Sequence, residues 1–173
     1  MHSLASLDGE WVEAEGQVQP PNALHAPLTG LPCVLYLVEL TPWQRLAEYV
    51  TLYRQNPHRE IGGAPFHLEL VDGMQVLVDA SQARLTLRST VRRRVRLGVD
   101  PELDARLHQL YRRLGRRGPR RDTVDCRERS LWVGQQVQLS GWLVRCPTAS
   151  GELVAGYRGA PMQWRLLATQ LRA

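Results

Sequence analysis

Short segments in which apolar and polar residues alternate recur along this chain of 173 residues, and turn-forming residues separate them. Trp11 to Val18 alternates in this way, and Cys33 to Leu40 is mostly apolar. A period of two places successive side chains on opposite faces of an extended segment, which is typical of β-strands. About seven such strands in a chain of this length predict a mostly β (α+β) fold built around a small closed barrel.

The clearest hairpin runs from Phe66 to Asp79, with Asp72-Gly73 at its tip. A two-residue turn there would mix polar and apolar residues on one face, whereas a three-residue loop separates them. The longer loop also places Gly73 where a left-handed backbone conformation is required. We therefore predict a loop at 71–73 and three apolar pairs across the hairpin: Leu70 with Met74, Leu68 with Val76, and Phe66 with Val78. With the strand at 11–18 and three C-terminal strands at 131–145, 152–157 and 162–169, this hairpin would form the barrel.

Two helices are expected among the strands. Asp100 as N-cap and Pro101 at the first helical position begin an amphipathic helix at 101–114, with leucines at helical spacing and Gly115 after it. Thr41-Pro42 has a similar helix-start pattern and predicts a second helix at 42–54. The segment 49–53 is equally compatible with a strand.

The composition predicts one domain over residues 1–173, because 43% apolar residues suffice to bury a core at this length. Three cysteines without a close pair (Cys33, Cys126 and Cys146) favour a reducing compartment. Cys126 and Cys146 could approach each other, although free thiols are the better interpretation. The N-terminus lacks the features of a signal peptide, and no apolar run approaches the ~20 residues that span a bilayer. We expect a soluble, cytoplasmic protein without membrane insertion.

Arginine supplies all 22 basic residues, and thirteen of them fall between Arg84 and Arg121 beside three acidic residues. From Arg84 to Arg96 most arginines occupy even positions and most apolar residues occupy odd ones, so an extended segment would carry an arginine stripe. More arginines gather at the C-terminal end of the predicted helix, where the helix dipole favours cations. This basic strand–helix insertion at about 84–121 is either a solvated surface or a face that binds an anionic partner.

The candidate binding residues are eleven of these arginines and Trp142, which alternates with polar residues and is therefore expected outside the barrel: Arg84, Arg88, Arg92, Arg94, Arg96, Arg112, Arg113, Arg116, Arg117, Arg120, Arg121 and Trp142. Trp164 alternates with Met162 and Leu166 and is expected in the core. No nucleophile–base pair, phosphate-binding loop or metal-ligand spacing accompanies these residues. We therefore expect a protein that is not an enzyme and that needs no metal or cofactor.

Four segments in order resemble the GIDE domain of the mitochondrial ubiquitin ligase family and its prokaryotic relatives. They are VEAEGQV with HAPLTGLPCVLYLVEL behind it, APFHLELVDGMQVLVDASQA, the basic insertion, and RERSLWVGQQVQLSGWLVR. The similarity covers most of residues 9–170 and rests on turn glycines and alternating apolar residues. It implies an OB-like barrel in an interaction domain that is normally tethered to membranes.

This chain departs from the family because it shows neither a transmembrane segment nor the clustered Cys/His ligands of a RING, so ligase activity is not carried over. The function that we expect is a non-catalytic interaction module whose arginine-rich face binds a protein partner or another acidic surface. The alternative is a single-stranded nucleic-acid-binding OB-fold protein, in which a basic groove and stacking aromatics would hold the strand.

Overall fold

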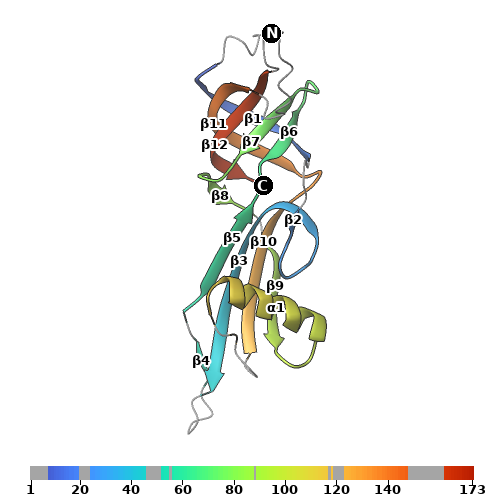
Figure 1. Ribbon diagram of the computed structural model, residues 1–173, viewed down its shortest axis with the longest axis vertical. Helices are drawn as coiled ribbons and strands as arrows, with labels where there is room; N and C mark the ends of the chain where they lie inside the picture. The colour runs from blue at the N-terminus through green and yellow to red at the C-terminus, as the bar shows by residue number, and fades with distance from the viewer. Residues whose placement is uncertain are drawn as a thin grey trace, which may run out of the picture. The chain divides into compact units, whose positions relative to one another are not determined.

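The structure is a computed structural model that describes residues 8–19, 24–45, 52–54, 56–87, 89–116, 118, 123–147 and 162–173. These residues form a mostly β protein with a closed five-stranded barrel, a half-barrel sheet and one helix (Figure 1). The chain divides into two compact units. The barrel unit comprises residues 1–23, 63–87 and 132–173, and the sheet unit comprises residues 24–62 and 88–131. Neither unit is a continuous stretch of chain, and the single domain over residues 1–173 stays a prediction.

Five strands close the barrel: β1 (Glu10–Gln19), β6 (Phe66–Leu70), β7 (Gln75–Asp79), β11 (Gln136–Pro147) and β12 (Met162–Arg172). The order around the barrel is β1-β6-β7-β12-β11, and β11 pairs with β1 to complete the circle. All neighbours are antiparallel except β7 and β12, which are parallel. A short strand, β8 (Arg84–Thr86), continues beyond β7 and pairs in parallel with the end of β12.

Two glycines allow the barrel backbones to approach closely. A Cβ atom at Gly16 would lie 2.3 Å from the carbonyl oxygen of Glu69, and one at Gly141 would lie 2.2 Å from that of Leu167. Gly16 joins β1 to β6, and Gly141 joins β11 to β12. Closure of the barrel therefore depends on positions where no side chain fits.

The sheet unit contains six strands and the helix: β2 (Leu24–His25), β3 (Pro32–Arg45), β4 (Leu52–Arg54), β5 (His58–Gly63), β9 (Ser89–Arg96), β10 (Thr123–Trp132) and α1 (Pro101–Arg113). The main order is β2-β3-β10-β9, and β4 and β5 also pair with β3. Among the described residues, no strand pairs with the other edge of β9. This sheet is open where the barrel is closed.

Helix α1 confirms the helix predicted at 101–114. The side chain of Asp100 caps its N-terminus by accepting hydrogen bonds from the backbone N–H groups of Glu102 and Leu103, both at 3.1 Å. The buried face of α1 packs on one side of the sheet, which we call the inner face. That contact contains apolar residues of α1, β3, β9 and β10: Leu107, Leu110, Tyr111, Val38, Leu40, Val95 and Val124.

The predicted hairpin is confirmed in its register. Phe66 faces Val78 and Leu68 faces Val76, and the backbone N–H of Leu70 donates to the carbonyl of Met74 at 2.8 Å. Gly73 has a φ of +80°, as the three-residue loop requires.

The helix predicted at 42–54 is wrong, because β3 continues to Arg45 and β4 pairs with it through Trp43 and Arg54. Thr41 and Pro42 are buried within the strand, so contacts across the sheet override the local helix-start pattern. Residues 46–51 and 55 lie outside the described residues.

The strand predicted at 131–145 is also corrected, because β10 ends at Trp132 and β11 begins at Gln136. A turn separates them, with Gly134 at a φ of +81°. The strand predicted at 152–157 lies outside the described residues.

Candidate anion-binding face

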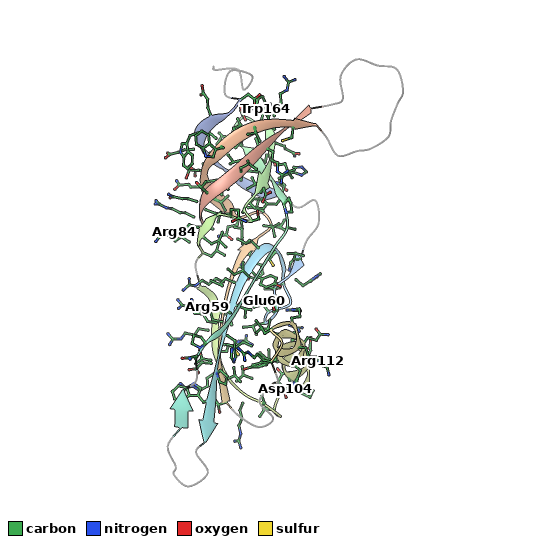
Figure 2. The ribbon with its side chains drawn as sticks, turned by 60° about the vertical axis from the view of Figure 1, so that its left-hand side comes forward. Arg59, Glu60, Arg84, Asp104, Arg112 and Trp164 are labelled. Atoms are coloured by element: carbon green, nitrogen blue, oxygen red, sulfur yellow. The ribbon has the colours of Figure 1, made fainter. Side chains whose placement is uncertain are left out.

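The structure distributes the predicted binding residues over several surfaces. Arg84 lies on β8 of the barrel unit, and Trp142 lies on β11 of the same unit. The sheet unit holds two further groups. Arg92, Arg94 and Arg96 lie on β9. Arg112 (Figure 2) and Arg113 end α1, and Arg116 follows it. The remaining predicted residues lie outside the described part of the chain: Arg88, Arg117, Arg120 and Arg121.

The arginine stripe is interrupted between β8 and β9. Leu87 is buried after β8, and β9 belongs to the other sheet. The sequence predicts that arginine and apolar residues alternate along one extended segment from Arg84 to Arg96. In the structure the chain passes from one unit to the other within this segment. Arg84 therefore belongs to a different unit from the arginines of β9.

Within β9 the alternation holds and defines an outer face of the sheet. Val95 packs on the inner face with α1, so Arg92, Arg94 and Arg96 project from the opposite side, where all three are exposed. Pairing with β10 places Arg92 opposite Arg127 and Arg94 opposite Asp125. Arg127 is exposed, and the sheet thereby juxtaposes two arginines that are 35 positions apart in sequence.

Arg94 is anchored by two side chains, one on the adjacent strand β10 and one on β3 beyond it. Its Nε donates to Oδ1 of Asp125 at 2.7 Å, and its guanidinium lies 5.2 Å from the centroid of the Trp43 ring. The indole Nε1 of Trp43 donates to Oδ2 of Asp125 at 2.8 Å. The hydrogen bond and the charge of Asp125 raise the pKa of Arg94. This triad fixes one arginine and neutralises it.

Other arginines extend the outer face. Arg59 of β5 forms an ion pair with Glu39 of β3 at 2.6 Å, and Arg129 alternates with Arg127 on β10. We call the following set the outer arginine face: Arg59, Arg92, Arg94, Arg96, Arg127 and Arg129, together with Glu39 and Asp125. Arg92, Arg96 and Arg127 form no ion pair with any residue that the structure describes. Six cations face two carboxylates there.

The arginines of α1 lie on the other side of the sheet, because α1 covers its inner face. Arg113 donates to both oxygens of Glu60 at 3.0 and 3.2 Å, and the phenol of Tyr36 donates to the same carboxylate at 2.7 Å. Burial, followed by the hydrogen bond to Glu60, raises the pKa of Tyr36 to about 12. Arg113 thus ties the helix to β3 and β5. Arg112 (Figure 2) and Arg116 are exposed beside it.

Trp142 is exposed, as predicted, with 48% of its surface accessible. Its ring contacts Trp11 edge to face, with 5.5 Å between the ring centroids. It lies on the barrel unit, so the structure does not join it to the outer arginine face in one unit. Trp164, expected in the core, is half-buried on β12 (Figure 2).

Sequence reasoning missed three arginines of the outer arginine face, Arg59, Arg127 and Arg129, and also Trp43, which contacts Arg94 and Asp125 there. The signal for two of them was present, since Arg127 and Arg129 flank Glu128 in an alternating strand. Both residues lie beyond Arg121, where the window of highest arginine density ends. Arg59 joins the face only through the pairing of β5 with β3, and Trp43 only because β3 lies beside β10.

The cysteines are free thiols in the structure. Cys33 and Cys126 are buried in the sheet unit, and burial raises their pKa values to about 11 and about 12. Cys146 is half-buried and lies on the barrel unit, so Cys126 and Cys146 do not share a unit. Within the described ranges, no three His, Cys, Asp or Glu side chains gather in a way that could hold a metal ion.

The described residues contain no helix with the length and hydropathy needed to cross a membrane. Comparison of the chain with models of protein families, with curated proteins and with solved structures finds no match. The resemblance to the GIDE domain therefore stays a prediction from the sequence.

Proposed function

We propose that the protein is a non-catalytic binding module whose outer arginine face holds an acidic segment of a protein partner. The observation that carries this proposal is the group Arg92, Arg96 and Arg127, which are exposed on one face and lack an ion pair among the described residues. Planar guanidinium groups bind carboxylates through paired hydrogen bonds. The charges of Arg94 and Asp125 cancel each other. Arg92, Arg96 and Arg127, which form no ion pair with a described residue, lie around this pair.

The chemistry of the face favours a protein over a nucleic acid. Bases of a single strand stack on open aromatic rings, and Trp43 is the aromatic that the described side chains place there. The guanidinium of Arg94 already lies over that ring. Ile61, which alternates with Arg59 on β5, is 63% exposed and offers an apolar contact of the kind found at the centre of protein interfaces.

Single-stranded nucleic acid is the second candidate, and the barrel is the observation that favours it. β11 returns to lie beside β1, and β1, β6 and β7 follow in order, which is a Greek-key arrangement. A small five-stranded Greek-key barrel is the framework of OB-folds, many of which bind oligonucleotides. We also propose that the barrel is of the OB type and that the chain is related to the GIDE domain. We propose a cytoplasmic location for the protein.

Fluorescence anisotropy with two labelled probes tests the proposal. One probe is a glutamate-rich peptide with interspersed leucines, and the other is mixed-sequence single-stranded DNA or RNA, each titrated from low salt to ~0.15 M. The test variant changes Arg92, Arg96 and Arg127 to Gln. The control changes Arg84, Arg145 and Arg172 to Gln, which removes the same charge from the barrel unit.

We expect the peptide to bind at ~0.15 M salt and the test variant to bind it at least about tenfold more weakly, while the control binds as the unmodified chain does. DNA or RNA could instead bind more tightly than the peptide, with a slope of log binding constant against log salt concentration that is smaller in magnitude by about two in the test variant. That result would identify a nucleic acid, and not an acidic peptide, as the ligand of this face. Equal losses in both variants would assign binding to net charge and overturn the proposed face.

A further inference from the structure

A second surface lies on the barrel, where β1, β11 and β12 run side by side (Figure 1). Their registers arrange the outward side chains in three rows across the strands. The rows are Trp11, Trp142 and Leu167; then Glu13, Ser140 and Gln170; then Glu15, Gln138 and Arg172. Successive rows are two residues apart along β1 and β11, or about 7 Å. On β12 the first two rows are three residues apart, because Leu167 is followed by Gln170.

The second and third rows line a hollow of about 340 Å³. A register shift between Ser140 and Gly141 gives β12 one extra residue beside the hollow, and the hydroxyl of Thr169 donates to the carbonyl of Ser140 at 3.2 Å. Bulges of this kind often re-aim side chains next to binding sites. The volume is at the lower end of the range that small-ligand pockets occupy.

The lining of the hollow suits a ligand that both donates and accepts hydrogen bonds. Glu13 and Glu15 offer carboxylates that accept, Arg172 donates, and the amides and hydroxyl of the other lining side chains do both. Arg84 faces Gln170 from β8, so two guanidinium groups balance two carboxylates. The carboxylates repel anions and the guanidinium groups repel cations, so the lining favours polar ligands without a net charge.

The first row supplies an aromatic shelf beside the polar hollow. Trp11 and Trp142 are 46% and 48% exposed and meet edge to face, and Leu167 is 39% exposed beside them. Large aromatic rings left in solvent on a sheet face usually mark a binding surface. A sugar ring matches the two halves of this surface, because its C–H face is apolar and its hydroxyls donate and accept.

We propose that this barrel face binds a neutral saccharide chain. One sugar ring stacks on Trp142 or Trp11. The hydroxyl groups of the next sugar ring form hydrogen bonds with Glu13, Glu15 and Gln138. The site is independent of the outer arginine face, whose residues belong to the other unit.

Affinity electrophoresis of the full chain in native gels tests this site. The gels contain one soluble neutral polysaccharide each: hydroxyethyl cellulose, glucomannan, xylan, glycogen or a β-1,3-glucan. We expect at least one polymer to retard the chain and its hexasaccharide to change the tryptophan fluorescence on titration.

Three variants identify the surface. Trp142→Ala and Glu15→Gln should each weaken saccharide binding about tenfold or more. Val71→Ala, which removes an exposed apolar side chain at the hairpin tip of the same unit, should leave it unchanged. Circular dichroism checks that each variant is folded.

The absence of retardation in every polymer would overturn the site, as would undiminished binding by a folded Trp142→Ala variant. Displacement of the polysaccharide by single-stranded DNA would assign the surface to nucleic acid instead. Loss of peptide binding in the Arg92, Arg96 and Arg127 variant does not affect this test, so the two proposals fail separately.

Discussion

The two units of the chain carry opposite charge. The sheet unit contains 17 arginines against nine acidic residues, whereas the barrel unit contains five arginines against eight. On the barrel face acidic side chains of β1 and basic side chains of β12 and β8 occupy opposite ends of the polar rows, but on the outer arginine face the cations outnumber the carboxylates. The difference indicates that the two units are suited to different ligands.

The interactions that stabilise each unit internally also differ. Close backbone approach at Gly16 and Gly141 closes the barrel, and its hydrogen-bonded strands leave no open edge among those five. Polar side chains join the elements of the sheet unit, as Glu60 does between β5, β3 and α1. We therefore expect backbone substitutions to damage the barrel most and polar substitutions to damage the sheet unit most.

Gly141→Ala is expected to have the largest effect on stability. The new Cβ would meet the carbonyl oxygen of Leu167 at 2.2 Å and the Cα of Ala168 at 2.8 Å, and neither backbone atom can move without opening the barrel. Overpacking of this kind costs about 1–3 kcal/mol or more. Chemical denaturation should show a lower midpoint, with Gly118→Ala as the control because its nearest contacts are 3.5 Å away. Equal midpoints for the two variants would contradict the account of closure.

Glu128→Ala should be the most damaging single change in the sheet unit. This fully buried carboxyl group accepts from the backbone N–H of Leu28 at 2.6 Å and from the hydroxyl of Thr29 at 2.7 Å. Removal leaves a buried donor unsatisfied and should cost about 1–3 kcal/mol. Glu128→Gln keeps one acceptor oxygen and should lose less. If the alanine variant and the unmodified chain unfold at the same temperature, Glu128 does not stabilise the segment that contains Leu28 and Thr29.

Local features of the fold could be predicted from the sequence. The hairpin loop at 71–73, helix α1 and the exposure of Trp142 depend on residues within a few positions of each other, so period and turn chemistry suffice. The helix predicted at 42–54 failed because the partners of Trp43 are Asp125 and Arg54, which local pattern cannot reveal.

The candidate site could be predicted only in part, for the same reason. Alternation on β9 indicates which arginines share one face of one strand. It does not indicate that β10 brings Arg127 opposite Arg92, or that α1 lies on the other side of the sheet. The division into two units follows from pairings between distant segments, so the arginine-rich window looked continuous in sequence.

High pH should weaken the sheet unit through Tyr36. Its folded pKa of about 12 lies above its ordinary value of 10.0, so its contribution is complete below pH 10 and is lost between about pH 10 and 12. Cys33 and Cys126 shift in the same direction, and their contribution begins to fall near pH 9. Stability measured against pH should therefore fall above pH 9, and less steeply above pH 10 in Tyr36→Phe. An unchanged slope in Tyr36→Phe would show that Tyr36 titrates normally.

Arg92→Gln should have the smallest effect, and its sign is informative. Arg92 faces Arg127 directly across the strands, and opposed like charges destabilise a sheet by a few tenths of a kcal/mol. The substitution should leave stability unchanged or raise it slightly at low salt, and salt should erase the difference. Arg94→Gln is the matched control, because it removes a paired arginine and should lower stability. If Arg92→Gln is destabilising at low salt, Arg92 has an intramolecular partner, and the anion-binding proposal loses one of the three arginines that form no ion pair with a described residue. A neutral or stabilising result leaves a repulsion within the folded sheet that an acidic ligand would relieve.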